Sequence, residues 1–324
     1  MSASAVKRIN AGRRFALTGT PIENSMKELW SIFDFLLPGY LGKYAEFKEA
    51  YELPAAAGNK DAMELLKKRI KPFILRRMKK DVLSELPEKL EEVMYAKMTE
   101  EQSKLYASYR HIAKDKALAT IAENGRGNME ILTLLLRLRQ ISCHPSLFDA
   151  GYKDGSGKLD LLFDLVETAL SSDHRILVFS QFTSMLSIIG KGLDERSIKY
   201  FYIDGSTNPE QRVELCNRFN NGENGVFLIS LKAGGTGLNL TGADTVIHYD
   251  PWWNPAVTDQ ASDRAYRIGQ TKNVHVIRLA AADSVEAKII SLQEKKRNLA
   301  NHIININNGS LGNLSSDEIL SLFE

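Results

Sequence analysis

The chain has 324 residues, enough for about two domains with a substantial hydrophobic core. Hydrophobic residues make up 44% of it and charged residues 25%, which excludes a disordered tail, a collagen-like fibre and a disulfide-stapled miniprotein. The 42 Lys and Arg residues nearly balance the 40 Asp and Glu residues, and a net charge of +2 does not by itself indicate a nucleic-acid partner. The two cysteines, Cys143 and Cys216, have neither metal-binding nor redox spacing, which favours a reducing, cytosolic compartment.

The first segment with a clear pattern lies between residues 15 and 37. Apolar residues 15–17 predict a short strand that leads into a Gly-Pro turn. Asn24 or Ser25 can then cap a helix over 26–37, whose apolar residues share one face. The residues before this segment are charged rather than apolar, so no signal peptide is expected. No stretch of the chain is long and apolar enough to predict a membrane span.

Residues 60–80 are unusually basic, with nine Lys or Arg residues against two acidic ones and a local charge of +7. Two interpretations stay open for this stretch: a solvated helix face, or a surface that contacts phosphate or a neighbouring lobe. Residues 99–145 follow a helical pattern, which the polar, glycine-containing run 124–128 interrupts. This part of the chain is therefore predicted to be two helices.

After Lys158 the pattern changes to short runs of β-branched and aromatic residues. The five runs predicted as strands are Ile176–Phe179, Tyr200–Ile203, Val226–Ile229, Val246–Tyr249 and Val274–Leu279. Near-continuous apolar strands that alternate with helical segments predict an α/β fold with a parallel sheet covered by helices. From about residue 283 the chain is predicted to be helical again.

Ligands of open α/β sheets collect at the carboxyl ends of the strands, and three polar motifs are predicted to lie there. Ser180 and Gln181 follow the first strand, where they can donate to a phosphate oxygen or simply cap the next helix. The run from Ser230 to Asn239 follows the third strand and has three glycines within four positions. Such a run lets backbone amides approach an anion, although a plain tight loop is the alternative.

A third motif contains Gln260, Arg264 and Arg267, spaced i, i+4 and i+7, which would place them on one stripe of a helix. Two guanidinium groups and an amide can neutralise charge on a transferring phosphoryl group, as arginine fingers do. The alternative is a solvated helix face. Just before this motif, Trp252 and Trp253 lie in a proline-stiffened loop, where they can pack in the core or stack on nucleic acid.

Two motifs of a nucleotide-hydrolysing motor are absent from these residues. No GxxxxGK[ST] run is present to hold phosphates, and no apolar strand ends in Asp-Glu to hold magnesium. The sequence also has no HExxH, GxSxG or zinc-binding spacing, so no metal-ligating residues are predicted.

Several motifs occur together in one order, and they carry a resemblance. They are LTGTPIEN at 17–24, PFILRR at 72–77, LPEK at 86–89, the pairs Arg139-Gln140 and His144-Pro145, AGGTGLNL at 233–240 and QASDRAYRIGQ at 260–270. In this order they resemble the SWI/SNF family of helicase superfamily 2, the DNA-dependent ATPases of chromatin remodelling and their bacterial relatives. The compact form is most similar to bacterial or archaeal members.

The resemblance implies functional roles by matched position. The residues implied to contact DNA are Thr18, Gly19, Thr20, Ser180, Gln181, Ser230, Lys232 and Thr236, and the stacking interpretation adds Trp252 and Trp253. Those implied to bind ATP are Gly235, Gly237, Arg264 and Arg267, with Gln260, Arg264 and Arg267 as the catalytic set at the γ-phosphate. The implied cofactor is ATP with Mg²⁺, and the implied partner is double-stranded DNA, along which such motors step as two RecA-like lobes close and reopen.

The resemblance also implies an organisation of the chain. The expected segments are the tail of a first RecA-like lobe with a basic linker (1–95), a helical protrusion (96–157), the second RecA-like lobe (158–282) and a C-terminal helical extension (283–324).

In this family the Walker A lysine and the Asp-Glu box lie upstream of the LTGTP motif, and here only 16 residues precede Leu17. We therefore expect this polypeptide alone not to hydrolyse ATP and to need the first-lobe half in cis or in trans. The alternatives are a non-catalytic nucleic-acid or protein-binding module and, less favoured, a small-molecule α/β enzyme that uses the glycine loop. A membrane partner is not expected, and a bacterial member would be cytoplasmic and nucleoid-associated.

Overall fold

The computed structural model describes residues 2–18, 26–56, 59–75, 86–124, 128–234, 237–302 and 316–323. The chain divides into two compact units. The first is formed by Met1–Ser84 with Ala300–Ser310, and the second by Glu85–Leu299 with Leu311–Glu324. Among the described residues, no helix combines the length and the apolar character needed to cross a bilayer.

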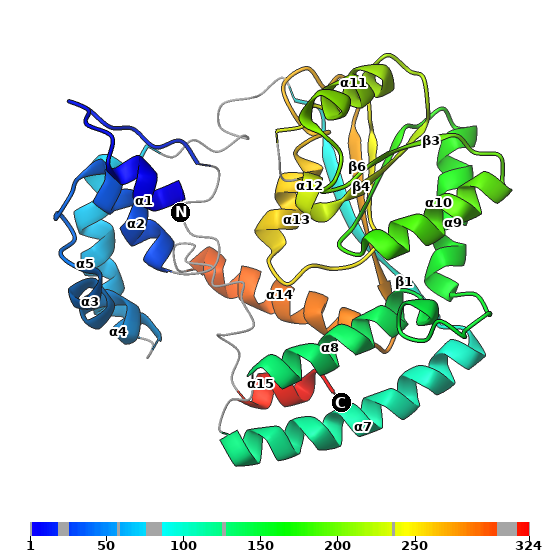
Figure 1. Ribbon diagram of the computed structural model, residues 1–324, viewed down its shortest axis with the longest axis horizontal. Coiled ribbons are helices and arrows are strands. Elements are labelled where there is room, and N and C mark those ends of the chain that lie inside the picture. Colours follow the sequence, from blue (N-terminus) through cyan, green and yellow to red (C-terminus); the bar gives the residue numbers. More distant parts are fainter. Residues whose placement is uncertain are drawn as a thin grey trace. The chain divides into compact units, whose positions relative to one another are not determined.

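The first unit is helical (Figure 1). Its elements are α1 (Ser2–Lys7), α2 (Met26–Leu36), α3 (Tyr44–Phe47), a π-helical turn (Lys48–Glu52), α4 (Leu53–Ala56), α5 (Lys60–Ile70) and a 3₁₀ turn (Lys71–Phe73). The helix predicted over 26–37 is confirmed, and its apolar stripe buries Met26, Leu29 and Phe33 in the core of this unit. Within the basic stretch, Arg69 donates to Tyr51 Oη at 2.9 Å, so one of the nine cations contributes to the packing of this unit.

The strand predicted over 15–17 is wrong. Residues 14–18 have no regular structure, and the side chains of Phe15 and Leu17 are 83% and 101% exposed. A strand is held by hydrogen bonds to a neighbouring strand, and the described part of the first unit contains no strand with which this segment could pair. The predicted capping residues Asn24 and Ser25 lie outside the described residues.

The second unit is built on a six-stranded parallel sheet (Figure 1). Its strands are β1 (Lys89–Ala96), β2 (Ile176–Ser180), β3 (Tyr200–Ile203), β4 (Val226–Ser230), β5 (Thr245–His248) and β6 (Val274–Ala281). They lie in the order β1-β6-β5-β2-β4-β3, and every neighbouring pair is parallel. The predicted α/β fold with a parallel sheet is therefore confirmed, and all carboxyl ends of the strands lie at one edge of the sheet.

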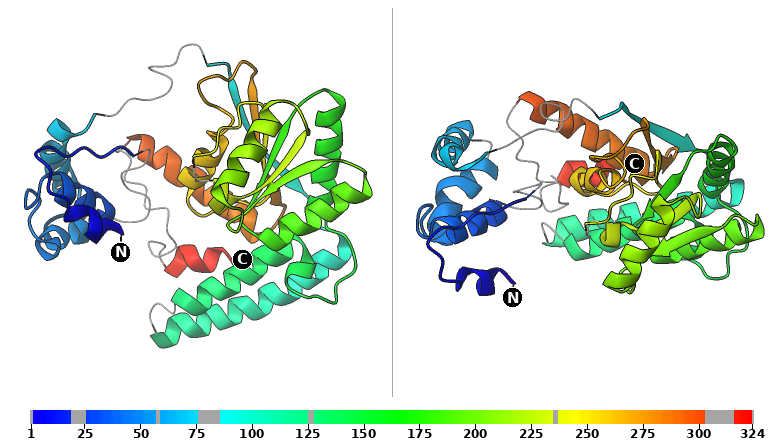
Figure 2. Two further views of the ribbon diagram at one scale, coloured as in Figure 1. Left: turned by 45° about the horizontal axis from the view of Figure 1, so that its top comes forward. Right: turned by 90° about the horizontal axis from the view of Figure 1, so that it is seen from above.

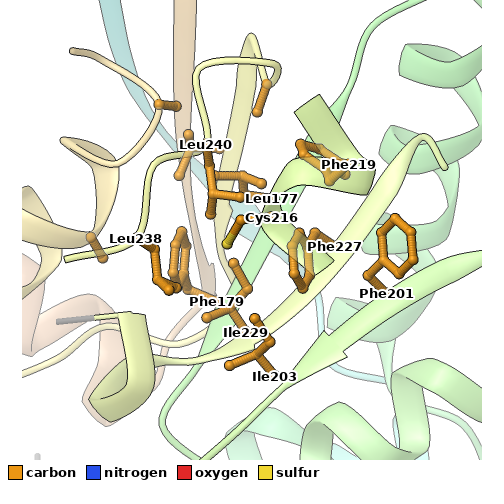
Figure 3. Close-up of a cluster of buried hydrophobic side chains, with 14 of the residues drawn as sticks. Leu177, Phe179, Phe201, Ile203, Cys216, Phe219, Phe227, Ile229, Leu238 and Leu240 are labelled. Carbon is orange, nitrogen blue, oxygen red and sulfur yellow. The ribbon is translucent and has the colours of Figure 1, made fainter. Parts of the chain in front are cut away.

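Helices cover both faces of this sheet. The helices of the second unit are α7 (Glu100–Asn124), α8 (Asn128–Cys143), α9 (Gly157–Ser171), α10 (Thr183–Glu195), α11 (Pro209–Asn220), α12 (Leu231–Gly234), α13 (Pro255–Ser262), α14 (Val285–His302) and α15 (Ser316–Ser321). Leu177 and Phe179 of β2 face the hydrophobic cluster under α11 and α13, which Figure 3 shows in part. Their neighbours Ile176 and Val178 point to the opposite face and pack against α9 and α10. Because both faces of these strands are buried, successive residues are apolar and not alternately apolar and polar.

The two helices predicted over 99–145 form a hairpin, α7 and α8, that lies side by side in both views of Figure 2. Apolar residues of this hairpin form a third buried cluster with α14 and α15. At the end of α8, Lys158 Nζ lies 2.7 Å from both carboxylate oxygens of Glu286, and both side chains are fully buried. Because Lys158 belongs to α9 and Glu286 to α14, this ion pair joins two helices that are far apart in the sequence.

The sequence analysis missed one strand. We expected five strands and placed residues up to about 95 in the first lobe and its linker, but β1 pairs with β6 along its whole length. The reason is its position at the edge of the sheet, where half of its residues are exposed and adjacent Glu91 and Glu92 break the apolar run. Residues 89–96 therefore belong to the same sheet as the predicted strands.

Candidate functional site

Polar residues from separate parts of the sequence meet where the central strands end. Ser180 and Ser230 are direct partners in the β2–β4 register, and Asp250 follows β5, the other neighbour of β2. Two of the three predicted strand-end motifs are therefore adjacent. The motif that begins at Gln260 starts within α13 and continues into the turn that follows this helix.

The Asp250 carboxylate is the centre of a buried cluster with Ser180, Gln181 and Arg139, called here the Asp250 cluster. Ser180 Oγ donates to Asp250 Oδ1 at 2.5 Å, and Gln181 Nε2 donates to Asp250 Oδ2 at 2.6 Å. Burial raises the pKa of Asp250, and the nearby Arg139 guanidinium opposes that shift. We expected Ser180 to contact DNA, but its side chain is 1% exposed and its hydroxyl is bonded to Asp250. In this structure only the partly exposed Gln181 of the pair is accessible to a ligand.

Arg139 is a residue to which the sequence analysis assigned no role. It is 2% exposed, and it is among the largest fully buried side chains of the described chain. Its Nη1 donates to Gln181 Oε1 at 3.1 Å, its Nη2 donates to the carbonyl of Pro251, and Nη2 lies 3.7 Å from Asp250 Oδ2. The signal in the sequence was an arginine at a position of α8 where the helical pattern requires a buried residue.

The two tryptophans flank this arginine. The Arg139 guanidinium lies 5.8 Å from the ring centre of Trp252 and 5.4 Å from that of Trp253, within cation–π range. Both rings are half-buried: Trp252 packs against the core under α13, and Trp253 packs against the cluster of α7 and α8. These contacts are those of the packing alternative, and stacking on nucleic acid stays a prediction.

The glycine loop begins directly at the end of β4. Ser230 is buried, and its Oγ accepts from the backbone N–H of Ala233 at 3.3 Å, so it caps the short helix α12. We expected Ser230 to contact DNA, but its side chain is not exposed in this structure. Lys232 is exposed at this end of the sheet, and Gly237 has a left-handed φ of 52°. Gly235 and Thr236 lie outside the described residues.

The predicted helical stripe of Gln260, Arg264 and Arg267 is wrong, because α13 ends at Ser262. Only Gln260 lies on the helix. Arg264 and Arg267 lie in a turn, where Arg264 is half-buried and Arg267 is exposed. Burial lowers the pKa of Arg264, and the positive charge of Arg267 lowers it further.

Gln270 anchors the turn that carries the two arginines. Its Nε2 donates to the carbonyls of Ala243 (2.7 Å), Thr241 (3.1 Å) and Ala265 (3.1 Å), and its Oε1 accepts from the backbone of Thr271 and Lys272. The Arg264 carbonyl in turn accepts from Leu240 N–H at 3.0 Å, next to the glycine loop. Side-chain bonds to backbone groups therefore replace the helix as the element that positions Arg264 and Arg267.

A buried histidine supports the base of this region. His248 stacks on Phe179 with ring centres 5.4 Å apart, and its Nε2 lies 2.8 Å from Ser262 Oγ. Ser262 Oγ also lies 3.1 Å from the Thr258 carbonyl, so the hydroxyl joins the histidine ring to the backbone of α13. Burial, with smaller contributions from the positive charges of Arg278 and Lys89, lowers the pKa of His248 to about 3.

This histidine predicts a pH dependence of stability. Unfolded His248 takes up a proton near its ordinary pKa of about 6.5. The folded ring stays neutral down to about 3, so the free energy of unfolding should fall as pH is lowered between these values. The contribution of this residue to the slope of the unfolding free energy against pH is at most about 1.4 kcal/mol per pH unit.

Urea unfolding of wild type and His248→Gln between about pH 7 and pH 5 measures this slope. The exposed His111→Gln is the control, and a slope unchanged in His248→Gln would contradict the prediction.

The other predicted site residues lie elsewhere. Thr18 is exposed in the first unit, and Gly19 and Thr20 lie outside the described residues. In the described ranges, no group of three or more His, Cys, Asp or Glu side chains could hold a metal ion. Two arginines on one turn beside a glycine loop do fit the phosphates of a nucleotide.

Comparisons with known proteins identify the family. The SNF2-related domain matches residues 1–147, and the helicase conserved C-terminal domain matches residues 157–269. The SWI2/SNF2 ATPase core of Sulfolobus solfataricus, solved in complex with double-stranded DNA, is similar with a TM-score of 0.61 and 38% identity over 99% of this chain and 68% of that chain. The chain belongs to the SWI2/SNF2 ATPase family. The resemblance stated from the sequence is thus confirmed, and the sheet of the second unit is the RecA-like C-terminal lobe of a helicase.

Bacterial relatives of this SWI2/SNF2 chain are much longer. An uncharacterised ATP-dependent helicase of Mycoplasma pneumoniae is 38% identical over 99% of this chain but only 30% of its own length. The putative ATP-dependent helicase/translocase YwqA of Bacillus subtilis is 38% identical over 98% of this chain and 35% of its own length. The chain therefore spans about a third of the length of these curated relatives.

Proposed function

We propose that this SWI2/SNF2 chain acts as the C-terminal half of an ATP-dependent translocase on double-stranded DNA. In this proposal it supplies DNA contacts and arginine fingers to an ATP site, while the Walker A lysine and the Asp-Glu box come from a first lobe, in cis or in trans. Residues up to about 88 contain the tail of that lobe and its basic linker, and the sheet from β1 to β6 is the second lobe. The Mg²⁺ that accompanies ATP is held by the first lobe.

The observation that carries this proposal is the arrangement of Arg264 and Arg267. Both lie in a turn held by Gln270 beside the glycine loop, and Arg267 is exposed, so its guanidinium can reach a phosphate outside this unit. An arginine finger stabilises the charge that develops on a transferring phosphoryl group, and it acts only where a metal and a phosphate loop already hold the nucleotide. The described residues contain no carboxylate cluster for that metal.

DNA contact is proposed for the accessible polar residues at the carboxyl ends of the strands. Of the described strand-end residues that we expected to contact DNA, Gln181 and Lys232 are accessible, while Ser180 and Ser230 are buried. Lysine and amide groups of this kind contact phosphate oxygens without reading base sequence. The motor is therefore expected to track the DNA backbone, and a bacterial host would place it at the nucleoid in the cytoplasm.

The test is ATP turnover with and without duplex DNA, measured on the 324-residue chain alone and after addition of a first-lobe protein that carries the Walker A motif and the Asp-Glu box. We expect no DNA-stimulated hydrolysis from the chain alone and clear hydrolysis from the mixture. Hydrolysis by the chain alone that Arg267→Ala abolishes would contradict the proposal. Salt-dependent DNA binding without hydrolysis in the mixture would favour the alternative, a non-catalytic nucleic-acid-binding module.

A further inference from the structure

A pocket separate from the strand-end motifs lies where β1 and β6 end and α7 begins. It has a volume of about 300 Å³, and the residues that line it include Lys97, Ser103, Tyr106, Arg110 and Asp283. Because every strand of this sheet is parallel, the ends of β1 and β6 lie at the same edge as Gln181 and Lys232. The pocket is therefore on the edge of the sheet at which we propose that DNA binds.

The two cations of this pocket have no partner in the part of the chain that the structure describes. Neither Lys97 nor Arg110 makes a side-chain hydrogen bond or ion pair there, whereas nearby Lys104 bridges Glu100 and Glu101. Asp283 is the single acidic residue of the lining, and it lies within ion-pair distance of neither cation. The pocket thus has a formal charge of +1 and two cations available to an anion.

A buried tyrosine adds a hydrogen-bond donor. Tyr106 is 4% exposed, and its oxygen accepts from the backbone N–H of Val285 at 2.8 Å. Its hydroxyl hydrogen has no acceptor among the described residues. Burial raises the pKa of Tyr106 to about 12, so this hydrogen is present at neutral pH. The exposed Ser103 supplies a second hydroxyl, and Ala107 between Ser103 and Arg110 leaves space over the helix.

We propose that this pocket binds a backbone phosphate of the DNA that the motor holds. A phosphate offers several acceptor oxygens and a negative charge, which match one lysine, one guanidinium and two hydroxyl donors. Such contacts fix the position of a protein on a duplex without reading sequence. This inference rests on the proposed function, and it adds the α7 hairpin to the surface that contacts DNA.

The experiment is binding of a labelled DNA duplex by fluorescence anisotropy over a series of salt concentrations. The variants are Lys97→Ala, Arg110→Ala and Ser103→Ala. Lys116→Ala is the matched control, because Lys116 is an exposed lysine of α7 that does not line the pocket. Losing one charged phosphate contact should weaken binding about tenfold for Lys97→Ala and for Arg110→Ala. The slope of log affinity against log salt should fall by about 0.9 in each. Ser103→Ala should weaken binding less, and Lys116→Ala should change affinity by less than about twofold.

The outcomes separate the two proposals. If wild type does not bind DNA, the proposed function fails. If wild type binds and Lys97→Ala and Arg110→Ala leave affinity and slope unchanged, or if Lys116→Ala weakens binding as much as they do, the pocket assignment alone is overturned. A second arm titrates inorganic phosphate at constant ionic strength. Phosphate binding that Arg110→Ala abolishes, together with unchanged DNA affinity, would assign the pocket to free phosphate and also overturn the DNA assignment.

Discussion

Arg267→Ala should lower DNA-stimulated ATP turnover by about 10³-fold or more in a preparation that also contains the first lobe. The guanidinium is exposed on a turn that Gln270 anchors, so its removal takes away charge stabilisation from the transition state and leaves the fold intact. Steady-state hydrolysis in the presence of duplex DNA measures the effect. DNA affinity of the same variant should stay near that of wild type, because this arginine acts on the nucleotide.

Two further variants make this result specific. Arg267→Lys keeps the charge but loses the planar fork, so we expect it to recover only a small part of the activity. Arg218→Ala removes an exposed arginine of α11 that pairs with Glu223. Arg218 lies outside the turn that carries Arg264 and Arg267, so this variant should leave ATP turnover unchanged. Turnover of Arg267→Ala above about one tenth of wild type would contradict a finger role for this residue.

Arg139→Met should destabilise the second unit by about 3–5 kcal/mol, because it leaves the Asp250 carboxylate buried without its cationic partner. The variant also removes the hydrogen bond to Gln181 and the cation between the two tryptophan rings. Urea unfolding measures the loss. Tryptophan fluorescence gives a second readout, since two of the three tryptophans of the chain, Trp252 and Trp253, flank Arg139.

The control lies two residues away on the same helix. Arg137→Met removes the same charge from α8, but Arg137 is exposed, donates to Gln140 and lies 6.0 Å from the ring centre of Phe148, so a change within about 0.5 kcal/mol is expected. Arg139→Lys should recover part of the stability, because it restores a charge without the bonds that the guanidinium makes with Gln181 and Pro251. If Arg137→Met and Arg139→Met lowered the free energy of unfolding equally, the contacts of Arg139 in the Asp250 cluster would not be the cause of the loss, and the prediction would be wrong.

Strands that are buried on both faces were predictable from sequence. In β2, β4 and β5 every residue is buried, so the interior of each strand is apolar and stands out against its polar flanks. The edge strand β1 was not predictable in this way, because only its β6 side is covered and Glu91 and Glu92 face solvent beside Arg278 and His275. The segment 15–17 gave the opposite error: its residues are apolar, but no strand of its unit is described beside it.

The order of the motifs along the chain determined the family, the class of fold and the two candidate finger arginines. These three predictions depend only on which residues occur and how they are spaced. Tertiary structure decided how each residue is used. The Asp250 carboxylate that accepts from Ser180 lies 70 residues away along the chain. The Pro251 carbonyl that accepts from Arg139 lies 112 residues away, and the Ala243 carbonyl that accepts from Gln270 lies 27 residues away. Hydrogen bonds between such distant segments form only when the parallel sheet aligns its strand ends, and no local pattern encodes them.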